Sequence, residues 1–142
     1  MLKDGQKVYL QRPVLQNLNS PAEEEIVVYP LKKEVIRDVV NDDIKCGNYL
    51  LGEIEGERWF SVFYAGRSTE RKLKERIAEH VGIHMDYPNA YFAFQEKATE
   101  EDAYHQECKD FHDFYDIDGY FINKSHPSKP SGKFIKCKIC NL

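Results

Sequence analysis

The sequence lacks the features that mark membrane, secreted and repetitive proteins. No window approaches the ~18 consecutive apolar residues that a membrane-spanning helix needs. The first residues, MLKDGQKVYLQRP, contain no apolar core of signal-peptide length. No internal repeat or low-complexity segment occurs. We therefore expect a soluble, cytoplasmic protein with no membrane partner.

Cysteine and net positive charge are also scarce. The 142 residues include four cysteines, which in an intracellular protein of this size we expect to be free thiols. The formal net charge of -4 argues against a protein that coats nucleic acid without specificity. Basic residues nevertheless gather at 67–76 and at 124–138, and the second segment holds five lysines and no acid. Such runs are usually solvated faces, so charge alone does not decide their role.

The apolar pattern is that of a folded domain, with 42% hydrophobic residues. Strands are predicted at 7–11, 25–29, 49–54, 59–66, 89–95 and 119–123, and helices at 31–40, 69–80 and 98–114. Ser68 or Thr69 can cap the second helix, and Thr99 can cap the third. The strands 49–54 and 59–66 flank the turn-like EGER and predict a β-hairpin.

These elements predict an α/β fold of the α+β type, with a small, mostly antiparallel central sheet flanked by helices. We divide the chain into three parts. Residues 1–45 form an N-terminal extension, a strand plus an amphipathic helix, packed on the core. Residues 46–127 form the core, and residues 128–142 form a basic tail that contains a CxxC pair.

The helix predicted at 69–80 carries polar residues on its apolar face. Leu73 and Ile77 are four residues apart and share the buried side. Arg76 and His80 fall on the same stripe. One interpretation is that Arg76 lies at the rim with its stem packed, and that His80 is a helix-end residue favoured by the helix dipole. The other is that both face an active site.

The helix predicted at 98–114 repeats this pattern with a carboxylate. Ala103, Glu107, Phe111 and Phe114 lie on one face, so Glu107 is surrounded by apolar residues. A buried carboxylate requires a positive partner, which can be an arginine, a lysine or a metal ion. Alternatively the helix is rotated, so that Tyr104, Cys108 and Phe111 face inward and Glu107 lies at the margin.

The order of these features resembles the GIY-YIG nuclease family over about residues 45–127. The matching positions are Gly47-Asn48-Tyr49, Tyr64-Ala65-Gly66, Arg76, His80, Glu107 and Asn123. The segment NKSHPSKPSG also resembles one bacterial subgroup of that family. Asn48 and Ala65 depart from the family motifs at middle positions, whose side chains should point away from the site. Extra residues after Gly66 leave Arg71 as an alternative to Arg76.

The resemblance implies a metal-dependent DNA endonuclease that hydrolyses phosphodiester bonds. Glu107 would bind one divalent ion, Mg²⁺ or Mn²⁺, and Arg76 would neutralise the scissile phosphate. Tyr49 would act as general base, while Tyr64 and His80 position the water or relay its proton. Asn123 would hold the site together by hydrogen bonds.

The basic residues around this site would attract the nucleic acid backbone. They are Arg67, Arg71, Lys72, Lys74, Lys124 and Lys129. The rival hypothesis is a non-catalytic nucleic-acid-binding module on the same fold. A single site nicks one strand, so cutting of both strands would favour a homodimer.

Cys137 and Cys140 supply half of a structural zinc site. His126, Cys46 and Cys108 are candidates for the remaining ligands. The alternatives are a plain tail that binds no metal, and an interaction domain built around a zinc ion.

Overall fold

A computed structural model describes residues 5–12, 22–115, 120–123, 125–130 and 134–141. The elements in these residues are β1 (Gln6–Arg12), β2 (Ala22–Pro30), α1 (Lys33–Val39), β3 (Gly47–Glu55), β4 (Trp59–Ser68), α2 (Leu73–Ala78), β5 (Tyr91–Glu96) and α3 (Glu100–Phe114). The fold is mixed α/β, as predicted. Across this part of the chain, no helix has the length and apolar character needed to cross a membrane.

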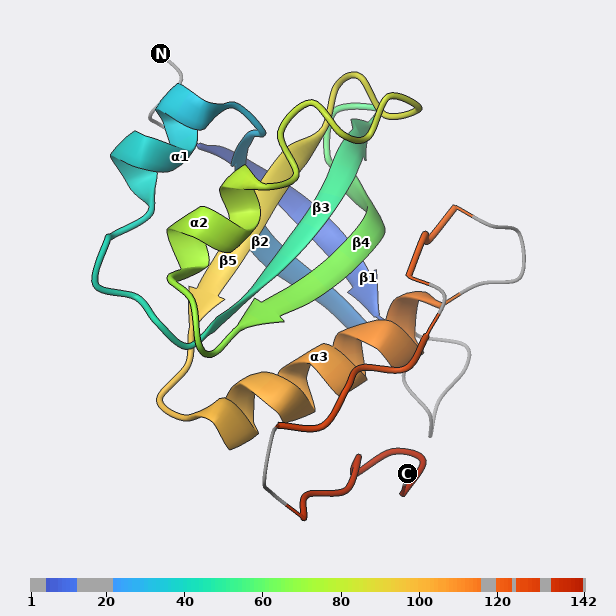
Figure 1. Cartoon of the computed structure of the whole chain (residues 1–142). Helices are drawn as coiled ribbons and strands as arrows, with labels where there is room; N and C mark the ends of the chain where they lie inside the picture. The colour runs from blue at the N-terminus through green and yellow to red at the C-terminus, as the bar shows by residue number, and fades with distance from the viewer. Residues whose placement is uncertain (1–4, 13–21, 116–119, 124, 131–133, 142) are drawn as a thin grey trace.

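The five strands close into a small barrel in the order β1-β2-β5-β3-β4 (Figure 1). Neighbouring strands run antiparallel except at the closure, where β1 meets β4 in parallel at Tyr9 and Trp59. There the Tyr9 amide donates a hydrogen bond to the Arg58 carbonyl at 2.6 Å. The predicted, mostly antiparallel sheet is thus confirmed. Its closure, which brings β1 and β2 into one sheet with the hairpin, is not visible in the sequence pattern.

The predicted hairpin is confirmed and forms the wall on which the site is built. β3 pairs with β4 on one edge and with β5 on the other. The register places Tyr49 opposite Gly66 and Leu51 opposite Tyr64, with a β-bulge between Leu51 and Gly52. The motif residues of the two strands therefore lie together at one end of the hairpin.

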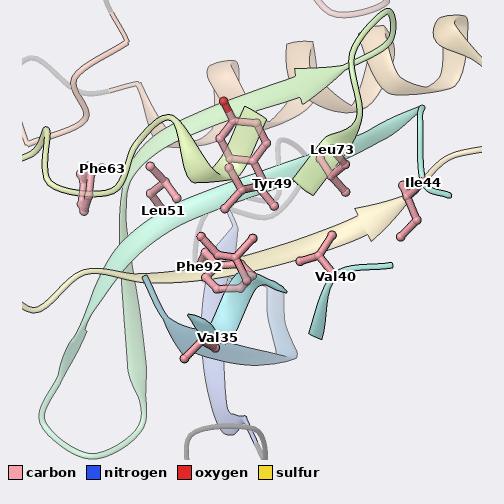
Figure 2. Packing of buried hydrophobic residues seen from close by; sticks show 10 residues of the cluster. Val35, Val40, Ile44, Tyr49, Leu51, Phe63, Leu73 and Phe92 are labelled. Atoms are coloured by element: carbon pink, nitrogen blue, oxygen red, sulfur yellow. The ribbon is translucent and has the colours of Figure 1, made fainter. Parts of the chain in front are cut away.

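The main hydrophobic core lies between this wall and the first two helices (Figure 2). Leu73 and Ile77 of α2 are fully buried there, as predicted, and Val35 and Ile36 come from α1. Complete burial of such a side chain contributes about 1.5–3 kcal/mol. Tyr49 belongs to the same cluster, so the core fixes the position of its ring.

Helix α2 is shorter than the predicted 69–80, and the predicted caps are wrong. Ser68 is still part of β4, and its hydroxyl donates to the carbonyl of Arg71. Lys72 precedes the helix without a side-chain cap. The Leu73 amide donates instead to the Ile44 carbonyl at 3.0 Å. A contact from outside the segment therefore takes up the first amide of the helix, and local capping chemistry could not reveal it.

Helix α3 begins two residues after the predicted start and has the predicted cap. The Thr99 hydroxyl accepts a hydrogen bond from the Asp102 amide at 3.1 Å. The helix lies along the barrel beside β4, and the C-terminal segment runs along it (Figure 1). Tyr104 and Cys108 are buried in a small separate core with Cys137. Both orientations considered for this helix hold in part, because one side of it faces β4 and another faces the C-terminal segment.

The strand predicted at 119–123 is wrong over Tyr120–Asn123, and Gly119 lies outside the described residues. Only the Ile122 amide makes a strand-like bond, to the Phe63 carbonyl at 2.7 Å. The backbone of Ala65, two residues further along β4, bonds instead to the side chain of Asn123. The segment therefore lies against β4 without forming a ladder.

The bulge predicts that Gly52→Ala is destabilising. A Cβ at this position would lie 2.4 Å from the Ser61 carbonyl oxygen and 2.8 Å from the Phe60 ring. We expect the free energy of unfolding to fall by about 1–3 kcal/mol in urea denaturation. Gly56→Asn is the control, because that turn position is open and its φ of 63° suits asparagine. Equal stability of the two variants would contradict the described packing.

Candidate active site

A cavity of ≈ 310 Å³ opens between the end of β4, the start of α2 and the side of α3. Its lining includes Tyr64, Gly66, Arg67, Arg71, Arg76 and Glu107. Three residues predicted to be catalytic and two predicted to bind nucleic acid thus face one cavity, although they come from distant parts of the sequence.

Glu107 forms an ion pair with Arg67 in the cavity wall. Arg67 Nη1 donates to Glu107 Oε1, and the two side chains are 14% and 15% exposed. Arg67 Nη2 also donates to the Ser128 carbonyl at 2.6 Å. Burial raises the pKa of the Glu107 carboxyl, and the charge of Arg67 opposes that rise. The positive group that the sequence required beside Glu107 is therefore Arg67.

The other two arginines that line the cavity both bind the carboxylate of Glu79. Arg76 Nη1 lies 2.7 Å from Glu79 Oε1, and Arg71 binds the second oxygen of Glu79. Arg71 also reaches Glu75, with 3.8 Å between Nε and Oε2. Exposed ion pairs contribute about 0–1 kcal/mol, so an anionic ligand can replace Glu79 at little cost.

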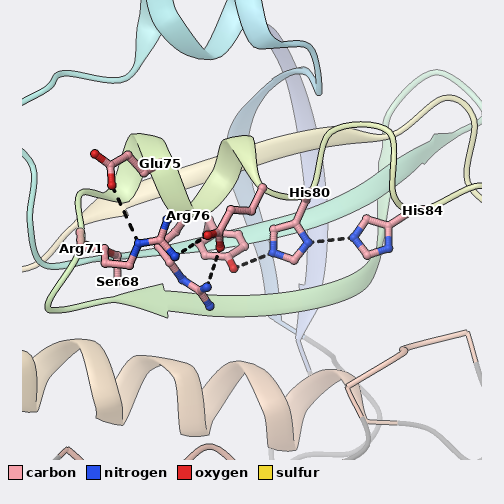
Figure 3. Close-up of polar contacts among 8 residues, drawn as sticks. Ser68, Arg71, Glu75, Arg76, His80 and His84 are labelled. Atoms are coloured by element: carbon pink, nitrogen blue, oxygen red, sulfur yellow. Dashed lines mark hydrogen bonds and ion pairs between the residues drawn. The ribbon is translucent and has the colours of Figure 1, made fainter.

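Tyr49 lies behind the cavity and begins a chain of hydrogen bonds. Its side chain is 1% exposed, and its hydroxyl lies 2.8 Å from His80 Nε2. His80 Nδ1 lies 2.8 Å from His84 Nε2 (Figure 3). Burial is the main cause that raises the pKa of Tyr49 above its usual value; Tyr64 adds to the rise. Burial, His84 and Arg76 together lower the pKa of His80 to about 4, so His80 is neutral at neutral pH.

Gly66 separates the Tyr49 hydroxyl from the cavity. Gly66 lines the cavity, and a Cβ added to it would lie 2.5 Å from the Tyr49 hydroxyl oxygen. Only glycine leaves the space that this hydroxyl occupies. The phenol oxygen of Tyr49 therefore lies against a residue that lines the cavity.

Asn123 fixes β4 at the second tyrosine motif, Tyr64-Ala65-Gly66. Its Oδ1 accepts from the Ala65 amide at 2.9 Å, and its Nδ2 donates to the Ala65 carbonyl at 2.8 Å. These two bonds hold β4 between Tyr64 and Gly66. Asn48, whose side chain was expected to point away from the site, donates to the Ala103 carbonyl of α3 at 2.9 Å.

Of the lysines predicted to bind nucleic acid, the three that the structure describes do not line the cavity. Lys72 and Lys129 are exposed to solvent, and Lys124 lies outside the described residues. Lys74 binds Asp42, with 3.0 Å between Nζ and Oδ1, and donates to the Arg37 carbonyl at 2.9 Å. The positive charge at the cavity therefore comes from the arginines.

A second cluster of polar side chains can hold a metal ion. It consists of His112, His126, Cys137 and Cys140, whose ligand atoms all lie within 4.8 Å of one another. Cys137 Sγ lies 3.5 Å from His112 Nε2, and Cys140 Sγ lies 3.4 Å from His126 Nε2. Burial alone would raise the pKa of Cys137, but hydrogen bonds from the Cys140 backbone and His126 outweigh it and lower that pKa to about 5.

Sequence reasoning identified His126 and the two cysteines of this cluster but missed His112. Cys46 and Cys108, the other candidates, are not part of it. His112 follows Cys108 by four residues on α3, and residues at this spacing share one helix face. His84 was missed in the same way, although it continues the four-residue spacing of Arg76 and His80. Both four-residue spacings are visible in the sequence. The residues that contact His112 and His84 are not.

Comparisons with protein-family models, with curated protein sequences and with solved structures each find no match to this chain. The chemistry proposed for it therefore depends on the arrangement of its own residues.

The neutral state of His80 predicts a pH-dependent stability. Between pH 6.5 and about 4 the unfolded chain binds a proton at His80 and the folded protein does not. Stability is therefore fully present above pH 6.5 and is lost as the pH falls towards 4. Allowing for solvent screening, we expect a loss of about 1–3 kcal/mol in urea unfolding. The free energy of unfolding of His80→Gln should fall less over this pH range. Identical pH profiles of stability for the variant and the wild type would contradict the prediction.

Proposed function

We propose that the protein is a metal-dependent endonuclease of the GIY-YIG type, which hydrolyses phosphodiester bonds in DNA. The observation that carries this proposal is the cavity in which Glu107 faces Arg76 and Tyr64. Tyr49 lies against Gly66 of the cavity wall and is bonded to His80. Acid, guanidinium and phenol groups thus converge at one place, as hydrolysis of a phosphate ester requires.

The arginines supply the affinity for phosphate. A guanidinium donates two parallel hydrogen bonds to a phosphate, which suits it to this anion better than an ammonium group. Arg76 and Arg71 share Glu79. A DNA phosphate that replaces Glu79 would bring its charge next to Arg76 and within reach of Glu107.

The donor set of the cavity fits a hard divalent ion. Mg²⁺ and Mn²⁺ bind through one or two carboxylates and keep several water ligands, so Glu107 suffices. The ≈ 310 Å³ beside Glu107 leaves room for these waters. Such an ion, when bound, polarises the phosphate and stabilises the leaving oxygen. Arg67 occupies Oε1 of Glu107 and so orients the carboxylate.

Tyr49 is the proposed base, and its environment requires a proton acceptor. Burial raises the pKa of Tyr49, so the phenol carries its proton at neutral pH. It can accept a proton from the attacking water only if it passes its own proton on. His80 Nε2, 2.8 Å away, is the acceptor, and His80 is neutral as this role requires. Tyr64, which lines the cavity, positions the water.

We also propose that the His112, His126, Cys137 and Cys140 cluster holds Zn²⁺. Two thiolates and two imidazoles are a typical ligand set for structural zinc. Around a tetrahedral zinc ion, a sulfur at about 2.3 Å and a nitrogen at about 2.0–2.1 Å lie about 3.5 Å apart. The two measured sulfur–nitrogen distances, 3.5 and 3.4 Å, agree with this geometry. Zinc would fasten the tail to α3.

The first test is nicking of supercoiled plasmid with and without Mg²⁺ or Mn²⁺. We expect metal-dependent nicking that Glu107→Gln reduces at least ~100-fold, because the carboxylate that binds the ion is lost. Glu101→Gln, on the exposed side of the same helix, is the matched control and should keep wild-type activity.

Circular dichroism should show that both variants are folded. No cleavage of any DNA form by folded wild-type protein would rule out the endonuclease. Salt-dependent DNA binding without cleavage would then support the non-catalytic binding module.

The second test is the metal content of the purified protein. We expect about one zinc per chain, and a chelator should lower the melting temperature because bound metal stabilises only the folded state. His112→Ala should lose the zinc, whereas Cys46→Ser should keep it, since Cys46 lies outside the cluster. Less than ~0.2 zinc per chain, measured by mass spectrometry of the metal, would overturn the assignment.

A further inference from the structure

The hydrogen-bond chain from Tyr49 does not end at His80. The two histidine rings stack with their centroids 5.0 Å apart and an interplanar angle of 15°. If the Tyr49 hydroxyl donates to His80 Nε2, the proton of His80 must lie on Nδ1 and be donated to His84 Nε2. All the bonds then point the same way, from Tyr49 to His84. This directionality is the property of a path along which protons hop.

The chain also joins two separate cavities. The first is lined by Tyr64 and Gly66, and the Tyr49 hydroxyl lies against Gly66. The second has a volume of ≈ 480 Å³, and both His80 and His84 line it. The two cavities share no lining residue. A proton that leaves the first cavity along the chain therefore reaches solvent in the second, away from the phosphate.

We propose that His84 is the proton-relay residue through which the proton of the attacking water leaves the active site. This rests on the proposed function and extends it by one residue. As the water oxygen bonds to phosphorus and the bond to the leaving oxygen breaks, the water proton passes to the Tyr49 oxygen. The hydroxyl proton of Tyr49 passes to His80 Nε2, and the Nδ1 proton of His80 passes to His84 Nε2. His84 releases a proton to solvent, and the leaving oxygen takes one from solvent.

The surroundings of the two rings favour His84 over His80 as the site of the positive charge. Burial is the main cause that lowers the pKa of His80 to about 4, and Arg76 contributes to the shift. The pKa of His84 is lowered by burial alone. The charged or titratable groups that face the two rings or line their cavity are Tyr49, Tyr64, Arg76, Glu79, Lys32, Tyr87 and Tyr91.

The kinetic test compares His84→Gln with Met85→Gln, a control at a neighbouring side chain that is 81% exposed. Glutamine keeps hydrogen-bonding groups but cannot carry a proton through its amide. We expect kcat for plasmid nicking to fall ~100-fold with KM unchanged. In the wild type, kcat should rise with pH until His84 is neutral and then level off. His84→Gln should lose this rising limb, and a variant that keeps both rate and limb would overturn the proposal.

A second measurement does not depend on activity. In ¹⁵N-histidine-labelled protein, Tyr49→Phe removes the hydroxyl at the start of the chain. We expect the ring nitrogen resonances of both His80 and His84 to shift, because the bonds polarise one another. A shift confined to His80 would overturn the relay. If the wild-type protein is inactive although its hydrogen-bond chain is intact, the proposed function is overturned and the relay with it. If the wild-type protein is active and His84→Gln nicks with the same kinetics, the relay alone is overturned.

Discussion

The ion pair between Arg67 and Glu107 joins β4, α3 and the tail, each of which contributes to the lining of the first cavity. Arg67 comes from β4 and Glu107 from α3, and the Ser128 carbonyl of the tail accepts from the same guanidinium. Burying two charges costs several kcal/mol, which their attraction offsets only if further contacts are made. Here the bond to Ser128 and the ring of Tyr104, whose centroid lies 5.2 Å from the guanidinium carbon, supply such contacts. This pair therefore links α3 and the tail to β4.

A buried ion pair is weak evidence of stabilisation, because apolar residues of the same volume would often serve as well. The pair is better explained by what it does to Glu107. Burial raises the pKa of this carboxyl, and Arg67 counteracts the rise, so the group can stay ionised in the cavity wall. The same contact with Arg67 orients it. The proposed binding of a hard cation by Glu107 requires both properties. The proposed zinc cluster supports the arrangement from outside, because Ser128 lies between its ligands His126 and Cys137.

The parts of the fold that could be predicted are those encoded by neighbouring residues. The EGER turn produces the hairpin, and Thr99 caps α3 through the amide three residues on. The errors arise where distant contacts decide the local structure. Helix α2 begins at Leu73 because Ile44 accepts its amide, and residues 120–123 form no strand because Asn123 bonds through its side chain. For the candidate site, the sequence predicted the residues on the two strands that carry the tyrosine motifs and those on the two helices. The roles of Arg67, His84 and His112 depend on partners in other elements, and no local pattern shows these.

The burial of Tyr49 imposes a condition on any chemistry at this site. The core holds the ring in place, and the same burial raises the pKa of its hydroxyl, so the phenol cannot be a ready base. Burial of His80 likewise lowers the pKa of its ring, so that residue cannot retain a proton near neutrality. The burial that holds each group in position also makes it a poor final acceptor for the proton. Basicity must then come from the least enclosed member of the chain, and His84 is that member. In the proposed reaction, the residue whose charge state matters is thus His84, the one farthest along the chain from the phosphate.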